Sequence, residues 1–274
     1  MVQDQPVGHD SLTDFSMEPF AFEDITHNVF RKGAGPAVIV MAEVPGITPT
    51  VADFARRVVD RGMTVYMPDL FGVAGAPRTN ANAAKVLTRI CISKEFQAFA
   101  LRTTAPVYEW LRALARKAAN DTGFSGVGAV GMCFTGGFAL AMATEPEMLA
   151  PVMSQPSLPV FFRPGAKTDP GCSDDDLLQI TQRCRAGELK VMGLHFSEDR
   201  LAPKERFAML HQALGPAFIE VPIDSSKGNP SGHPRIAHSV LTEDLIDVPG
   251  EPTHNALMGV LDFLENRLSR VPPK

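Results

Sequence analysis

Short apolar runs alternate with helical stretches along most of this 274-residue chain, and this alternation limits the possible folds more than any other feature. Apolar runs typical of buried parallel strands cover residues 37–41, 63–67, 150–154, 189–194 and 217–222. Helical patterns lie between most of them, and a last amphipathic stretch carries Leu257, Leu261, Leu264 and Leu268 on one face. The pattern predicts an α/β protein with a mostly parallel, doubly wound sheet flanked by helices.

We expect a single domain, because a chain of this length can bury about three quarters of its unfolded surface in one core. Residues 1–20 are polar and are predicted to form a loosely held N-terminal extension, so that the domain spans residues 21–270. An edge strand is expected at 25–31. A loop over 69–82 is predicted to lead to a helical stretch over 93–119, interrupted before Pro106.

The composition limits the kinds of molecule that the protein is expected to bind. The net charge of −5 offers no basic face for nucleic acid. No apolar run approaches the roughly 18 residues of a membrane span, and the N-terminus lacks the pattern of a signal peptide. Four cysteines without C-x-x-C pairs indicate free thiols in a reducing compartment. We therefore expect a cytoplasmic protein that acts on a small molecule.

Cys133 stands between an apolar strand pattern and a run of small residues, in the segment Gly131-Met-Cys-Phe-Thr-Gly-Gly137. Glycines on both sides allow a sharp strand-to-helix turn, which exposes the cysteine at the carboxyl edge of the sheet. Backbone N–H groups at a helix start favour a thiolate and can hold an oxyanion. This setting predicts a cysteine-dependent hydrolase. Cys91, Cys172 and Cys184 have no such setting and are interpreted as structural.

A thiol nucleophile needs a base and a carboxylate that orients the base, and on such a sheet the acid and then the histidine follow the nucleophile. The loop after the strand pattern 189–194 carries Glu198 and Asp199, of which we favour Asp199 as the acid and keep Glu198 as the alternative. After the strand pattern 217–222 the chain carries His233 and His238. We favour His238 as the base and keep His233 open.

Several segments together resemble one known family. They are the segments 38–46 (VIVMAEVPG) and 66–72 (YMPDLFG), the Cys133 turn, Asp199 ahead of Pro203, and His238-Ser239. In this order they resemble the dienelactone hydrolase family from about residue 25 to 268. The resemblance implies an α/β-hydrolase fold and a Cys-His-Asp triad at Cys133, His238 and Asp199.

The resemblance also implies three roles around the nucleophile. In dienelactone hydrolases, the glutamate that corresponds to Glu43 contacts the resting thiol and helps to take its proton when substrate binds. The oxyanion hole is then expected at the backbone N–H groups of Val44 and Phe134.

Three stretches depart from the family pattern. Thr135 stands where the turn usually has a glycine, and Asn229-Pro-Ser-Gly232 replaces a short aromatic-glycine approach to the histidine. The stretch 239–242 lacks an arginine that grips a substrate carboxylate in the family. Candidate replacements for it are Arg89, Lys94 and Arg102.

The sequence thus predicts hydrolysis of an ester or lactone through a thioester on Cys133. A non-catalytic binding protein of the same fold and a thiol redox protein that uses Cys133 are the alternatives. No metal or organic cofactor is expected, because the histidines lack paired ligand spacing and no phosphate-binding glycine motif follows a strand.

Overall fold

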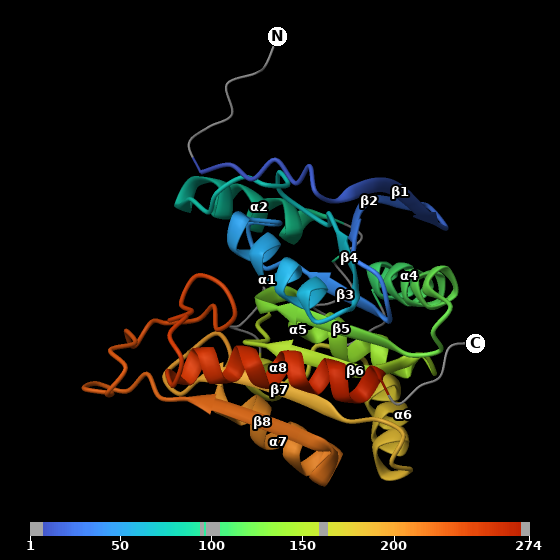
Figure 1. The fold of residues 1–274 in the computed structure, drawn as a ribbon. Coiled ribbons are helices and arrows are strands. Elements are labelled where there is room, and N and C mark those ends of the chain that lie inside the picture. Colours follow the sequence, from blue (N-terminus) through green and yellow to red (C-terminus); the bar gives the residue numbers. More distant parts are fainter. Residues whose placement is uncertain (1–7, 94–95, 97–104, 159–163, 270–274) are drawn as a thin grey trace.

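A twisted eight-stranded sheet forms the centre of the protein (Figure 1). The computed structural model describes residues 8–93, 96, 105–158 and 164–269. Within them the strand order is β1-β2-β4-β3-β5-β6-β7-β8. The strands are β1 (Ser16–Phe22), β2 (Ile25–Lys32), β3 (Ala37–Met41), β4 (Thr64–Pro68), β5 (Val127–Met132), β6 (Met148–Ser154), β7 (Val191–Phe196) and β8 (Phe218–Ile223). β1 and β2 run antiparallel at one edge, and the pairs from β4 to β8 are parallel, which confirms the predicted fold class.

Helices cover both faces of the sheet. They are α1 (Pro49–Asp60), α2 (Asn80–Ile92), α4 (Pro106–Thr122), α5 (Gly136–Ala141), α6 (Asp174–Arg185), α7 (Lys204–Leu214) and α8 (Pro252–Leu268). α1 and α8 pack on the face that is nearer in Figure 1, and α4 to α7 pack on the other face. None of the described helices is long and apolar enough to cross a membrane.

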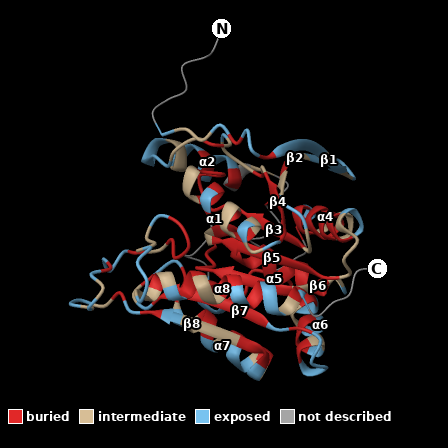
Figure 2. Cartoon of the chain, viewed as in Figure 1, coloured by how far each residue is buried: buried red, intermediate tan, exposed pale blue. Residues whose placement is uncertain are grey.

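The core consists of two apolar layers, one on each side of the sheet. Alternate residues of β3 enter different layers: Val38 and Val40 face α1 and α8, whereas Ile39 packs with the layer that contains Trp110 of α4. Residues buried on both faces explain why the strand sequences are continuous apolar runs instead of alternating ones. Figure 2 shows the buried strands between helices whose outer faces are exposed.

Local signals in the sequence determine where several helices begin and end. The Thr48 hydroxyl accepts a hydrogen bond from Val51 N at the start of α1, and Ser173 Oγ accepts from Asp176 N at the start of α6. Gly123, with a φ of 73°, ends α4 in the left-handed conformation that favours glycine. These helices therefore match the predicted ones to within a few residues.

Three elements differ from the prediction. β1 begins at Ser16, so the sheet starts before the predicted domain boundary at residue 20. β7 extends to Phe196, two residues beyond the apolar run. α2 begins at Asn80, inside the predicted loop, because Thr79 and Asn82 form a reciprocal capping box there, and it ends at Ile92, before the predicted helical stretch. α4 does begin at Pro106, and most of the predicted stretch before it lies outside the described residues.

The buried face of α8 should contribute strongly to stability. Leu257 is fully buried, so we expect Leu257→Ala to lower the free energy of unfolding by about 2–5 kcal/mol through lost packing and a cavity. Leu178 on α6 is 57% exposed, and Leu178→Ala should change stability by less than about 0.5 kcal/mol. Urea denaturation of both variants measures the difference, and equal effects would contradict the assigned orientation of α8.

Candidate active site

The carboxyl ends of the parallel strands meet at one edge of the sheet, where ligands bind in open α/β sheets. Glu43 follows β3, Cys133 follows β5, and Asp199 lies just after β7. The chain that carries His238 leaves the sheet at the end of β8. The topology therefore gathers the predicted site residues at the same edge, although they are up to 195 positions apart in the sequence.

Cys133 occupies a strained turn between β5 and α5. Its φ is +55°, a left-handed conformation that non-glycine residues rarely adopt. A Cβ atom on Gly131 would lie 2.0 Å from Thr135 O, and one on Gly136 would lie 2.7 Å from the Cα of Pro156. Neither position can hold a side chain without moving backbone, so the glycines around Cys133 are required by close packing. This geometry is that of a nucleophile elbow.

Thr135 is fully buried and ties this turn to β3. Its Oγ1 accepts a hydrogen bond from Met132 N at 2.9 Å and lies 3.1 Å from Met41 O, to which the hydroxyl can donate. The side chain therefore does not crowd the turn, although it is larger than the glycine usual in the family. Its hydroxyl instead joins the end of β5 to the end of β3, the strand that leads to Glu43.

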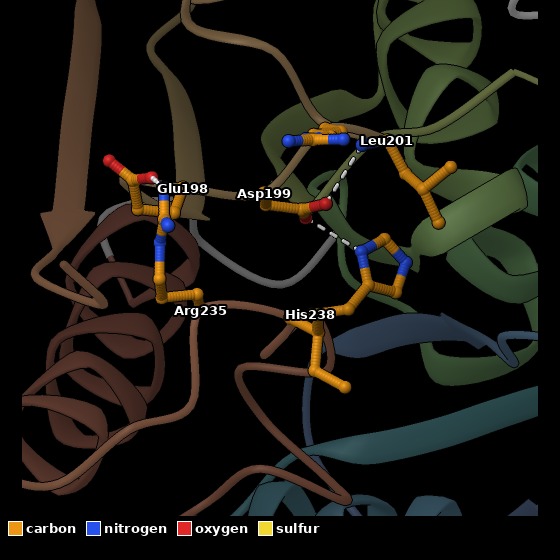
Figure 3. A pocket seen from close by; sticks show the side chains of 7 residues that line it. Glu198, Asp199, Leu201, Arg235 and His238 are labelled. Carbon is orange, nitrogen blue, oxygen red and sulfur yellow. Dashed lines mark hydrogen bonds and ion pairs between the residues drawn. The ribbon is translucent and has the colours of Figure 1, made fainter. Parts of the chain in front are cut away.

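Asp199, which is buried, and His238, which is partly buried, form a hydrogen-bonded pair (Figure 3). Asp199 Oδ2 lies 2.6 Å from His238 Nδ1, and Asp199 Oδ1 accepts from Leu201 N at 2.9 Å. The backbone N–H of His238 donates to Asp244 Oδ2 at 2.8 Å. These bonds hold both the imidazole and its backbone in one orientation. Because Nδ1 is engaged, the buried Nε2 is the ring nitrogen available to Cys133.

The electrostatic environment favours a charged His238. Burial alone lowers the pKa of this imidazole. The negative charges of Cys133 and Asp199, and the hydrogen bond to Asp199, outweigh burial and raise the pKa of His238 well above its ordinary value of 6.5. A raised pKa makes the imidazole a stronger proton acceptor.

Glu198 and His233, the alternative acid and the alternative base from the sequence, lie in other environments. Glu198 Oε2 accepts from Arg235 Nη2 at 2.5 Å in a partly exposed ion pair. The buried ring of His233 packs against Phe196 at 4.9 Å between centroids, and its backbone N–H donates to Asn229. His195 lies inside β7, where its Nε2 is 2.8 Å from Glu220 Oε1.

Glu43 is buried in a network of neutral donors. Ser239 Oγ donates to its Oε2 at 2.6 Å, Thr242 Oγ1 donates to Oε1, and Gln155 Nε2 lies 3.4 Å from Oε2. The Cys133 sulfur has a different partner, Ser157, whose Oγ lies 3.1 Å from it. In the described structure Glu43 is therefore bonded to the segment after His238, and not to the resting thiol as the resemblance implies.

Phe134 and Val44 carry the backbone N–H groups that the resemblance implies as oxyanion donors. Phe134 directly follows Cys133, and its ring packs among Phe71, Phe96 and Phe138 with centroids 5.0 to 6.1 Å away. Val44 follows Glu43 and is buried at the end of β3, where Gly46 N donates to Glu43 O in a tight turn. Both backbones are thereby held at the carboxyl edge of the sheet.

Two arginines at the site were not found from the sequence. Arg78 Nη1 lies 3.2 Å from Ser239 Oγ and 4.0 Å from Glu43 Oε2. Arg206 is buried and donates to the carbonyl oxygens of Asp169, Ala166, Leu201 and Pro156, which joins the loop of Asp199 to the loop of Ser157. Burial lowers the pKa of Arg206 to about 10, although Asp199 opposes this shift. No local motif marks either residue, because both contacts are made between distant loops.

Of the three residues predicted to replace the carboxylate-binding arginine, only Arg89 lies among the described residues. Arg89 is exposed on α2 and lines cavities beside Gly72 to which neither Asp199 nor His238 contributes. Lys94 and Arg102 lie outside the described residues. Among the described residues, no group of three or more His, Cys, Asp or Glu side chains could hold a metal ion.

The fold is shared with solved structures of one superfamily. A dienelactone hydrolase from Anabaena variabilis is 14% identical, with a TM-score of 0.57, and the match covers 94% of this chain and 97% of that one. The dienelactone hydrolase-like promiscuous phosphotriesterase P91, from metagenomic libraries, is 16% identical with a TM-score of 0.61, and the match covers 92% and 98%. The chain matches no curated protein by sequence.

The sheet order, the flanking helices and the cysteine elbow define an α/β-hydrolase. Residues 26–172, more than half of the chain, match the dienelactone hydrolase family. The protein belongs to that family and is a hydrolase of esters or lactones, with a small molecule as its substrate.

The Thr135 hydroxyl should be important for stability. Thr135→Val keeps the side-chain shape but leaves the buried N–H of Met132 without its partner, so we expect a loss of about 1–3 kcal/mol in the free energy of unfolding. Thr135→Ser keeps the hydroxyl and should lose only about 1 kcal/mol, through the missing methyl group. Urea denaturation compares the two variants, and a valine variant as stable as the serine variant would contradict the assigned role.

The Asp199–His238 pair should make stability depend on pH. Since the folded-state pKa of His238 is raised above its unfolded value near 6.5, the pair stabilises the fold fully below about pH 6.5 and loses this contribution as pH rises through the folded-state pKa. The stability gap between wild type and Asp199→Asn should therefore be widest near about pH 6 and narrow at alkaline pH.

Urea denaturation at a series of pH values measures this gap. Asp247→Asn, which alters the more exposed pair of Asp247 with His254, provides the control and should cost at most about 1 kcal/mol. A gap for Asp199→Asn that stays constant with pH would contradict the predicted coupling.

Proposed function

We propose that the protein hydrolyses its ester or lactone through a Cys133–His238–Asp199 triad and a thioester intermediate. The observation that carries the proposal is the partly buried His238, whose Nδ1 is 2.6 Å from Asp199 Oδ2 and whose pKa is raised by Cys133 and Asp199 together. A nucleophile, a base and an orienting acid that act on one another are the minimum for covalent acyl transfer. The left-handed Cys133 in its glycine-packed turn supports the same role.

In the first half of the reaction, His238 takes the proton of the Cys133 thiol and the thiolate attacks the substrate carbonyl carbon. The carbonyl oxygen becomes an oxyanion, which the backbone N–H groups of Phe134 and Val44 stabilise; one such donor is worth about 3 kcal/mol of barrier. The tetrahedral intermediate then collapses and the carbon–oxygen bond to the alcohol breaks. His238 donates its proton to the leaving oxygen, which leaves a thioester on Cys133.

In the second half, His238 takes a proton from water, and the resulting hydroxide attacks the thioester carbonyl. Collapse of this second intermediate breaks the carbon–sulfur bond and releases the carboxylic acid. The proton on His238 returns to the thiolate, so atoms and charges balance over the cycle. Asp199 keeps the imidazole in the tautomer that presents Nε2 to the reacting groups.

We propose that Glu43 acts on this site through the segment that carries the base. Its carboxylate binds Ser239 and Thr242, so it holds the backbone just after His238 against the end of β3. The same strand end carries Val44, one of the proposed oxyanion donors. Ser157, at 3.1 Å from the sulfur, is the partner of the resting thiol.

Substitution of the triad tests the mechanism. With a short aryl ester as substrate, Cys133→Ala and His238→Ala should each lower kcat by about 10³-fold or more, because the chemical steps lose their nucleophile or base. Glu198→Gln should leave kcat within about threefold of wild type, because Glu198 binds Arg235 at the partly exposed rim. Steady-state hydrolysis measures all three variants.

Further measurements distinguish a hydrolase from a binding protein and from a thiol redox protein. Mass spectrometry of wild type quenched during turnover should find one acyl group on Cys133. Turnover that survives in Cys133→Ala would sink the nucleophile assignment. A wild type that hydrolyses neither esters nor lactones would favour a binding protein, or a thiol redox protein if peroxide oxidises Cys133 rapidly.

A further inference from the structure

The Ser157 hydroxyl lies 3.1 Å from the Cys133 sulfur, and this contact is not part of the Cys-His-Asp triad. Ser157 is buried, with 8% of its surface exposed. Among the described residues, the sulfur is the one hydrogen-bonding partner of Ser157 Oγ. His238 Nε2 has no such partner among the same residues. In this structure the sulfur is therefore bonded to Ser157 and not to the base.

The backbone around Ser157 is held in place by the elbow and by α7. Ser157 N donates to Cys133 O at 2.9 Å, and Arg206 Nη1 donates to Pro156 O. Gln155 is fully buried and has a φ of +35°, a left-handed conformation that the packing around it must maintain. The hydroxyl therefore has a fixed position against the sulfur. Its removal leaves the bond between the Ser157 backbone and residue 133 intact.

The charge on the sulfur decides which atom of this pair donates the hydrogen bond. A serine hydroxyl can donate one hydrogen bond and accept two, whereas a thiolate can only accept. Once Cys133 has lost its proton, the Ser157 hydroxyl is therefore the donor. A hydrogen bond to a charged acceptor is roughly twice as strong as one between neutral groups. The contact is therefore stronger for the thiolate than for the uncharged thiol or thioester sulfur.

We propose that Ser157 is a further catalytic residue, whose hydroxyl donates to the Cys133 sulfur whenever that sulfur carries negative charge. This inference rests on the proposed function. When the second tetrahedral intermediate collapses, the electrons of the carbon–sulfur bond pass to the sulfur and the carbonyl of the acid product forms again. Ser157 keeps its own proton and stabilises the departing thiolate until His238 returns a proton to it. The hydroxyl thus does for the sulfur what the N–H groups of Phe134 and Val44 do for the carbonyl oxygen.

Alkylation of the sulfur tests this contact without a substrate. Peptide mass spectrometry measures the rate at which iodoacetamide modifies Cys133 over a series of pH values. At a given pH on the rising limb, Ser157→Ala should have about tenfold less thiolate than wild type, so its rate profile shifts to higher pH. At alkaline pH, where every Cys133 is a thiolate, the variant should react faster than wild type. A thiolate without its donor is the stronger nucleophile.

Two further variants serve as controls. Ser173 is as buried as Ser157, at 8% exposed, and its hydroxyl caps α6, so Ser173→Ala should keep the wild-type profile. Ser157→Thr keeps the hydroxyl and should restore that profile. A Ser157→Ala profile that coincides with wild type, or that differs from it by the same factor at every pH, would overturn the proposal. A shift to lower pH would also overturn it, because the serine would then favour the thiol as an acceptor.

Kinetics then connect the contact to the reaction. A rapid-quench experiment with 4-nitrophenyl acetate acetylates the enzyme, and mass spectrometry of the quenched samples follows the loss of the acetyl group from Cys133. Ser157→Ala should slow this loss by about three- to tenfold, and Ser173→Ala should not change it. The expected alkylation profiles in a protein that never forms an acyl group would overturn the hydrolytic mechanism alone. Loss of the acetyl group from Ser157→Ala at the wild-type rate would overturn the role of Ser157 alone.

Discussion

The left-handed backbone at Cys133 is the constraint on which the rest of the site depends. A φ of +55° costs a non-glycine residue about 1–3 kcal/mol, so the surroundings must hold it. Gly131 and Gly136 allow backbone to approach too closely for any side chain, and the Thr135 hydroxyl binds both the turn and the end of β3. The strain is thus maintained by the packing of β3, β5 and α5, and it points the sulfur out of the sheet.

The second requirement is a fixed position for the histidine, which lies in an irregular segment between β8 and α8. Such a segment needs partners for its backbone polar groups. Asp244 accepts from the N–H groups of both His238 and Ser239. Glu43 binds the side chains of Ser239 and Thr242. Asp244 therefore satisfies backbone groups here as strand pairing does elsewhere, and the buried Glu43 joins the histidine segment to β3, the strand that precedes the proposed oxyanion hole.

Much of the fold was predictable because both faces of the sheet are buried. β3 to β8 each appear as apolar runs, and caps such as Thr48 and Ser173 mark helix starts. α2 was missed because its start lies in a stretch rich in Gly, Pro and Asn, where the capping box of Thr79 and Asn82 is a weaker signal than the surrounding turn residues. β7 extends two residues beyond its apolar run, and so contains His195, since pairing with β8 continues as far as Phe196.

The sequence by itself determined the class of fold, the elbow at Cys133, the family, and the short lists from which an acid and a base could be chosen. Those features are local: apolar periodicity, glycines where backbones crowd, and motif order along the chain. Only the tertiary structure paired Asp199 with His238 instead of Glu198 with His233, bonded Glu43 to Ser239 instead of the thiol, and brought Arg78 and Arg206 to the site. These contacts join loops that are far apart in the chain, and their distances depend on how the strands and helices pack, which no local pattern encodes.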